Sequence, residues 1–129
     1  MGTFHLSSEL GSLGEELSCR YLKDKGYQIL ATNYCNAGGK RLGEIDIVAK
    51  QGDDIVFVEV KSRLGTLESD VLPEANITRD KLRKLERIAQ CYLREKKLER
   101  NSYHFDALSV LYDVQRKKAH IRHLDYIFI

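Results

Sequence analysis

The spacing of hydrophobic residues predicts one helix and one strand in the first part of the chain. Leucines and a tyrosine recur every three or four residues between positions 10 and 25, which places them along one face of a helix. Gly26 follows directly, and glycine commonly ends a helix because it adopts a positive φ without steric cost. Residues 27–34 are then predicted to form the first strand.

A β-hairpin is predicted next. Two segments rich in valine, isoleucine and phenylalanine, 43–48 and 57–63, lie on either side of the polar residues 51–54. Hydrophobic runs joined by a short polar turn are typical of a hairpin. Lys50 then pairs with Ile55, whether the turn is tight or takes in the whole polar segment.

This register gathers the charged residues of both strands. Asp46 lies opposite Glu59, and Glu44 lies opposite Lys61. Because strand side chains alternate between the two faces of a sheet, these charged residues are predicted to share one face. The other face takes the aliphatic residues Ile45, Ile47, Val58 and Val60.

The second half of the chain predicts another helix and two more strands. Thr78 is a suitable N-cap for the helix. Basic residues outnumber acidic ones between 79 and 100, a pattern that is usually a solvated helix face but also suits the phosphate backbone of a nucleic acid. Residues 103–111 and 119–128 are predicted to complete the sheet. The apolar stripe of the helix consists of Leu82, Leu85, Ala89, Tyr92 and Leu93.

Length and composition narrow the class of protein. The 129 residues contain no Gly/Ser/Pro-rich linker, so a single domain over residues 1–129 is expected. No apolar run approaches ~18 residues and no secretion signal is evident, so we expect a cytoplasmic protein without a membrane partner. The 3 cysteines form no C-x-x-C pair and the 4 histidines have no matching cysteine set, which argues against zinc. The formal net charge of +2 by itself does not indicate a nucleic-acid partner.

The clustered acids predict a cation-binding site. Carboxylates a few ångströms apart repel one another, and burial increases the repulsion, so Glu44, Asp46 and Glu59 need a compensating charge. Mg²⁺ favours one or two carboxylates together with carbonyls, waters and phosphate oxygens. Lys61 would orient or deprotonate an attacking water, or neutralise charge in the transition state. The alternative is a solvated sheet face, on which cross-strand pairs contribute ~0.2–1 kcal/mol each.

These residues also resemble a known signature. Asp46 followed by Glu59-Val60-Lys61 resembles the Asp…Glu-x-Lys pattern of the restriction-endonuclease-like superfamily, PD-(D/E)xK. A longer ordered set of positions resembles the YraN family, which is similar to archaeal Holliday-junction resolvases. The set covers nearly the whole chain and comprises Gly14-Glu15, Tyr21-Leu22, Gly26-Tyr27, Asn33-Tyr34, Gly43-Glu44-Ile45-Asp46, Phe57 to Arg63 and Phe105-Asp106.

The resemblance implies a restriction-endonuclease-like α/β/α core, an α/β fold with a mixed sheet flanked by helices. It implies that Asp46 and Glu59 are metal ligands, assisted by the Val60 carbonyl, and that Lys61 is the catalytic lysine. Glu15 would be a further catalytic acid, because related resolvases place an acidic residue on the first helix. The implied cofactor is Mg²⁺, with Mn²⁺ as a substitute.

Other residues are assigned supporting or binding roles. Glu44 would hydrogen-bond a metal-bound water or pair with Lys61. Arg63 shares the face of Lys61, and a guanidinium suits phosphate oxygens. Asp106 matches the Phe-Asp pair of the family, but we interpret it as a structural hydrogen-bond acceptor. The predicted nucleic-acid contacts are Arg63, Lys81 and Lys84.

We therefore predict a metal-dependent endonuclease that hydrolyses phosphodiester bonds, with branched or otherwise structured DNA as the substrate that the resemblance implies. RNA stays open as a substrate. Related resolvases act as dimers because they cut two strands symmetrically, so a homodimer is one possibility, and the sequence leaves the oligomeric state open. Two other classes are weighed: a non-catalytic nucleic-acid-binding module, which predicts metal-independent binding, and a protein-interaction domain, which predicts binding of neither nucleic acid nor metal.

Overall fold

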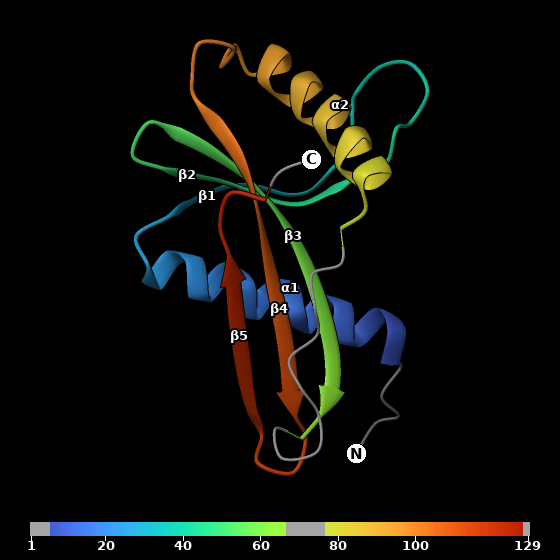
Figure 1. The fold of residues 1–129 in the computed structure, drawn as a ribbon, viewed down its shortest axis with the longest axis vertical. Helices are drawn as coiled ribbons and strands as arrows, with labels where there is room; N and C mark the ends of the chain where they lie inside the picture. The colour runs from blue at the N-terminus through green and yellow to red at the C-terminus, as the bar shows by residue number, and fades with distance from the viewer. Residues whose placement is uncertain (1–5, 67–76, 128–129) are drawn as a thin grey trace.

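The structure is a computed structural model that describes residues 6–66 and 77–127 (Figure 1). The described residues form one continuous sheet, with a helix packed on each side of its central strands. In chain order the elements are α1 (Leu6–Asp24), β1 (Gln28–Tyr34), β2 (Ile45–Gln51), β3 (Asp54–Gly65), α2 (Arg79–Glu95), β4 (Tyr103–Asp113) and β5 (Lys118–Leu124).

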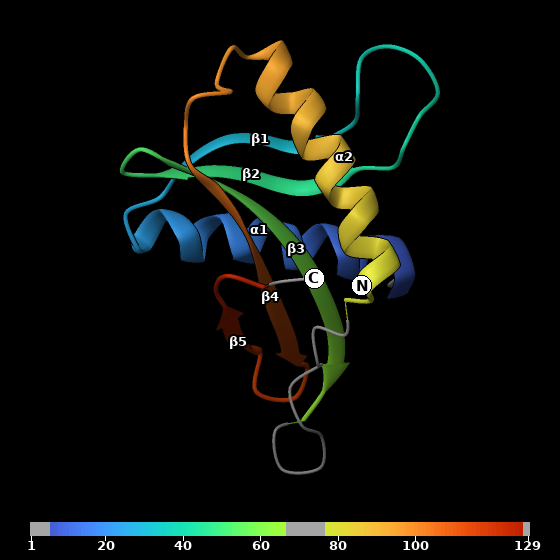
Figure 2. The same ribbon diagram turned by 45° about the horizontal axis from the view of Figure 1, so that its top comes forward.

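The strands form a 5-stranded mixed sheet in the order β1-β2-β3-β4-β5. β3 and β4 are parallel and run side by side in Figure 2, whereas the other neighbouring strands are antiparallel. Parallel neighbours need a long crossover connection, and α2 lies in the connection from β3 to β4. The expected α/β fold is confirmed, and it is compatible with a restriction-endonuclease-like core.

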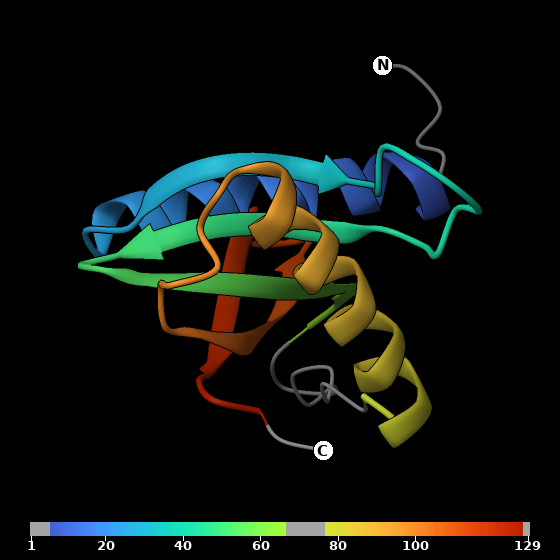
Figure 3. The same cartoon turned by 90° about the horizontal axis from the view of Figure 1, so that it is seen from above.

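The helices cover opposite faces of the sheet (Figure 3). Side chains of α2 pack on one face against Phe57 and Phe105. Leu22 of α1 packs on the other face against Val58 and Leu108. Neighbouring residues along β3 point to alternate faces, so both faces are apolar and each needs a covering helix.

The β2–β3 hairpin has the predicted register. Lys50 pairs with Ile55, and Gln51 pairs with Asp54, which leaves a tight turn that begins with Gly52. Gly52 has a φ of 61°, a conformation that costs glycine little. The sequence pattern therefore located both the turn and the pairing of the two strands.

The helix boundaries follow the predicted signals. α1 begins at Leu6, earlier than the predicted position 10, and Gly26 beyond its end has a φ of 91°. Thr78 is the N-cap of α2, and its Oγ1 accepts a hydrogen bond from the Lys81 amide at 3.1 Å. Neither α1 nor α2 is long and apolar enough to cross a membrane.

Two strands differ from their predicted lengths. β3 extends to Gly65, past its predicted end, because it pairs with β4 along its length. β5 ends at Leu124, short of the predicted position 128, because Tyr126 turns the chain with a φ of 53°. The Tyr126 amide then donates to the Asp106 carboxylate instead of a strand neighbour. Position 128 itself lies outside the described residues.

α1 approaches β3 closely at Gly14. A Cβ atom at this position would lie 1.8 Å from Ser62 Oγ and 3.0 Å from Ser62 Cβ, so a side chain does not fit between helix and strand. At Gly11, about one turn earlier, a Cβ would meet nothing within 4 Å. The close approach sets the position of the next residue, Glu15, relative to the sheet.

Gly14→Ala is expected to destabilise the fold by about 1–3 kcal/mol, because the added methyl group overlaps Ser62. Gly11→Ala is the matched control and is expected to be neutral or slightly stabilising, since alanine favours a helix more than glycine does. Urea unfolding followed by circular dichroism measures both variants. Equal unfolding midpoints would show that Gly14 does not limit the approach of α1 to β3.

Candidate active site

The candidate active site lies at one end of the β2–β3 ladder, which extends to the pair Ile47–Val58. One residue further along β2, Asp46 Oδ2 accepts a hydrogen bond from the Val60 amide at 2.8 Å. A side-chain acceptor thus satisfies a strand N–H at this point. The hydrogen bond holds the Asp46 carboxylate against β3, next to Glu59.

Asp46 and Glu59 line a cavity of about 310 Å³. Residues of α1 and of β3 complete its walls. The further lining residues are Leu10, Gly11, Glu15, Val60 and Ser62. The structure therefore brings Glu15, Asp46, Glu59 and Val60, predicted site residues from three elements, around one space.

Glu59 lies in surroundings that disfavour its charged form. Its side chain is 15% exposed. Burial, the charge of Asp46 and a hydrogen bond with Asp46 raise the pKa of Glu59 to about 7. Lys81 of α2 opposes this increase, with its Nζ 3.2 Å from Glu59 Oε1. The protein therefore holds two neighbouring acids with incomplete charge compensation.

Glu15 adds an acidic side chain from α1. Burial, and then the charge of Asp46, raise the pKa of Glu15, whereas a hydrogen bond with the Asn33 side chain lowers it. The Glu15 Oε1 atom is buried and has no hydrogen-bond partner among the described residues.

The contact between Asn33 and Glu15 was not predicted. Asn33 lies in β1 between the pairs Thr32–Ile47 and Tyr34–Ile45, and it has a φ of 52°. Sequence spacing carries no signal for this contact, because β1 and α1 meet only in the folded chain.

Two members of the predicted charged face do not line the cavity. Glu44 precedes β2, is exposed, and forms an ion pair with Arg41 at 2.9 Å, so the predicted pairing of Glu44 with Lys61 is wrong. Lys61 is exposed and is not among the described residues that line the cavity. Neither Glu44 nor Lys61 is therefore among the described residues that line the cavity with Asp46 and Glu59.

The predicted alternation of β2 also fails at its start. Ile45 packs in the cluster beneath α2, whereas Ile47 packs in the cluster beneath α1. Strict alternation requires a regular ladder, but the ladder with β3 extends only to Ile47. Gly43, with a φ of 132°, turns the chain just before the strand, and Asp46 contacts Val60 through its side chain.

The residues predicted to contact nucleic acid are all exposed, but one of them also contacts the acidic residues of the cavity. Arg63 and Lys84 are exposed, on β3 and α2 respectively. Lys81 is also exposed, but its ammonium contacts Glu59, so it belongs to the acidic cluster rather than to the solvated face alone. Nucleic-acid binding by Arg63 and Lys84 stays a prediction.

The donors at the cavity suit a hard divalent cation that keeps part of its water shell. Within residues 6–66 and 77–127, no group of three or more His, Cys, Asp or Glu residues is arranged to hold a metal ion. Mg²⁺ needs fewer protein ligands, since one or two carboxylates, waters and substrate phosphates commonly complete its shell. Asp46, Glu59 and the Val60 carbonyl fit that requirement. A positive charge here would also compensate the buried, unpartnered oxygen of Glu15.

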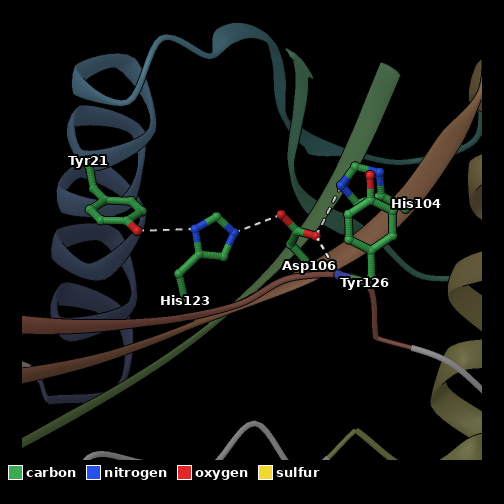
Figure 4. A network of polar contacts seen from close by, with 5 residues as sticks. All are labelled: Tyr21, His104, Asp106, His123 and Tyr126. Atoms are coloured by element: carbon green, nitrogen blue, oxygen red, sulfur yellow. Dashed lines mark hydrogen bonds and ion pairs between the residues drawn. The ribbon is translucent and has the colours of Figure 1, made fainter. Parts of the chain in front are cut away.

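Asp106 is a fully buried acid with partners at both oxygens (Figure 4). Its Oδ2 lies 2.7 Å from His123 Nε2. Its Oδ1 lies 3.3 Å from His104 Nε2 and accepts a hydrogen bond from the Tyr126 amide at 3.0 Å. The Tyr126 ring stacks on His104, with the ring centroids 3.8 Å apart.

This network extends to α1, because His123 Nδ1 lies 3.1 Å from the Tyr21 hydroxyl. It ties α1, β4, β5 and the chain after β5 together, which supports the interpretation of Asp106 as a structural residue. His123 and Tyr21 were not connected to Asp106 by sequence reasoning. Tyr21 and His123 are 102 positions apart, so no local spacing relates them.

Comparison with known proteins identifies the family. The model of "Uncharacterised protein family UPF0102" matches residues 14–110 of the chain. The chain belongs to the UPF0102 family. A UPF0102 protein of Pelotomaculum thermopropionicum is 40% identical over 119 residues, which cover 92% of this chain and 94% of the relative. A UPF0102 protein of Syntrophus aciditrophicus is 43% identical over 101 residues, which cover 78% and 74% respectively.

UPF0102 is the YraN family, so the predicted family is confirmed. The matched range includes the acidic residues of the cavity and Asp106, but it ends before His123 and Tyr126. UPF0102 membership by itself assigns no reaction, and the chemistry has to be inferred from the cavity.

Asp106→Ala is expected to destabilise the protein by about 2–4 kcal/mol, because it leaves the Tyr126 amide, the buried His104 imidazole and the partly buried His123 imidazole without their shared acceptor. Asp125→Ala is the matched control, since Asp125 is exposed. Urea unfolding followed by circular dichroism measures the free energy of unfolding. A loss no larger than that of Asp125→Ala would contradict the structural role of Asp106.

Glu59→Gln is expected to remove a pH dependence of stability in the cation-free protein. The folded state binds the Glu59 proton up to about pH 7, whereas the unfolded chain releases it near its ordinary value of 4.5. The free energy of unfolding should therefore decrease between these pH values, by on the order of 1–3 kcal/mol.

Urea titrations in the presence of a chelator at several pH values measure this slope. Glu16→Gln is the control, since Glu16 is exposed. Glu16→Gln is expected to keep the pH dependence of the wild type. If Glu59→Gln also keeps it, Glu59 is not the titrating group.

Proposed function

We propose that this chain is a Mg²⁺-dependent endonuclease that hydrolyses phosphodiester bonds in branched or otherwise structured DNA. The observation that carries the proposal is the pair of undercompensated carboxylates, Asp46 and Glu59, in a cavity of about 310 Å³. Acids that only stabilise a fold are expected to have partners, as Asp106 has. Acids that are kept close together without enough positive charge are typical of functional sites.

Asp46, Glu59 and the Val60 carbonyl would hold the cation. The Asp46–Val60 hydrogen bond orients one carboxylate, so that the site needs little rearrangement. When bound, Mg²⁺ polarises a phosphate group and favours ionisation of a coordinated water.

The remaining residues would handle protons and charge. Glu15, with its buried and unpartnered Oε1, would hydrogen-bond a water in the cavity and accept a proton from it. Lys61 follows Glu59 by two positions, so its side chain points to the same side of β3. It would orient the attacking water or neutralise charge on the phosphate. Glu44, paired with Arg41, is assigned a secondary role in supporting the chain that leads into Asp46.

The DNA backbone would lie along the exposed basic surface beside the cavity. The outward face of α2 is basic, and Arg63 on β3 is an exposed basic residue as well. Exposed basic side chains of α2 besides Lys81 are Arg79, Arg83, Lys84, Arg87 and Arg94. The preference for branched DNA and the action as a homodimer rest on the resemblance to Holliday-junction resolvases. RNA is the alternative polymer.

Asp46→Ala and Lys61→Ala are each expected to lower cleavage by on the order of 10²–10⁴-fold, because each removes a group that acts on the reacting phosphate or water. A labelled panel of linear, single-stranded, flapped and four-way-junction DNA is incubated with Mg²⁺ or Mn²⁺. A chelator should abolish cleavage by the wild type. Lys23→Ala is the matched control, since Lys23 is exposed near the end of α1, and circular dichroism checks the fold of each variant.

Unchanged cleavage in both Asp46→Ala and Lys61→Ala would exclude this site. A second candidate function is a non-catalytic nucleic-acid-binding module, which the position of Lys61 outside the cavity wall favours. It predicts binding without cleavage, independent of metal and weaker at higher salt. Binding of neither DNA nor a divalent cation would instead favour a protein-interaction domain.

A further inference from the structure

Lys81 reaches the acidic pair from α2, across the sheet from α1. Its amide donates to Thr78 Oγ1, which places it in the first turn of the helix. Its Nζ lies 3.2 Å from Glu59 Oε1. The contact therefore joins α2, which covers one face of the sheet, to the Glu59 carboxylate at the end of the β2–β3 ladder.

The two partners of this ion pair differ in burial. The Lys81 side chain is 51% exposed, whereas the Glu59 side chain is 15% exposed. Glu59 is held by β3 and by its neighbour Asp46, so it has little freedom to move. A lysine has a long flexible stem and an ammonium that water solvates strongly. Lys81 is therefore the partner that can leave.

The ammonium occupies a position where a second positive charge would be repelled. Lys81 compensates part of the negative charge of Asp46 and Glu59, which keeps the two carboxylates together when no cation is bound. A dication bound to the same carboxylates would lie within a few ångströms of the ammonium, and that repulsion is substantial even at high dielectric constant.

We propose that Lys81 is a positioning residue that serves as a built-in counter-ion: it holds Glu59 beside Asp46 in the cation-free protein and is displaced when a divalent cation binds. This inference rests on the proposed cation site. Its consequence is a site that is assembled before the cation arrives but binds the cation less tightly than its two carboxylates would allow.

Mn²⁺ binding to the full chain tests the proposal. Wild type, Lys81→Met and Lys96→Met are titrated by isothermal calorimetry in low salt at about pH 8.5, above the pKa of Glu59. Lys81→Met is expected to bind Mn²⁺ on the order of 10-fold more tightly than the wild type, because one repelling charge is removed. Lys96→Met removes the same charge at the other end of the helix, where Lys96 is the exposed C-cap, and its affinity is expected to stay within about 2-fold of the wild type.

Thermal unfolding supplies a second measurement. Without cation, Lys81→Met should have a lower Tm than the wild type, because the carboxylates lose their counter-ion. Saturating Mn²⁺ should raise the Tm of Lys81→Met by more than it raises that of the wild type. In a Glu59→Gln background, the further change Lys81→Met should have little effect on Tm. Lys81→Gln serves as a second variant if Lys81→Met does not fold.

The outcomes separate the inference from the proposed function. If the wild type binds no Mn²⁺, the proposed cation site is wrong. If the wild type binds Mn²⁺ but Lys81→Met or Lys81→Gln binds it equally or more weakly, the site stands and the counter-ion role of Lys81 is overturned.

Discussion

The parallel pairing of β3 with β4 is the constraint on which the rest of the structure depends. Parallel neighbours cannot be joined by a tight turn, so the chain between them forms a long connection that contains α2. α2 covers one face of β3, and α1 covers the other. β3 thereby lies between two helices, and Glu59 near its middle can be reached by Lys81 from one side while Glu15 lines the same cavity from the other.

The acidic pair follows from this placement. The backbone pairing of β2 with β3 ends at Ile47, and the next residue, Asp46, accepts a hydrogen bond from the Val60 amide through its side chain. This hydrogen bond holds the Asp46 carboxylate beside Glu59. Burial of Glu59 and then the charge of the neighbouring Asp46 raise the pKa of Glu59 to about 7. Lys81 supplies part of the missing positive charge. A divalent cation would supply more positive charge than Lys81 does, and Asp46 and Glu59 therefore suit metal-dependent chemistry.

Asp106 shows how the same fold stabilises an acid that is fully buried. Both of its oxygens have partners, from two imidazoles and from the Tyr126 amide. Stability requires such partners, because an unpaired buried carboxylate is costly. The cavity lacks them at Glu15, whose Oε1 is buried without a partner in the described part of the chain. This contrast between two acidic clusters in one small sheet distinguishes a structural network from a site with capacity for a ligand.

The sequence by itself determined what depends on neighbours along the chain. Hydrophobic periodicity predicted both helices and all the strands, the polar turn determined the pairing of Lys50 with Ile55, and Thr78 marked the start of α2. Only the tertiary structure decided which side chains meet between elements. Periodicity extended past the end of the ladder placed Glu44 opposite Lys61, but the ladder ends before that point and Glu44 pairs with Arg41 instead. Contacts such as that of Lys81 with Glu59 depend on how helices pack on the sheet, and local spacing does not encode that packing.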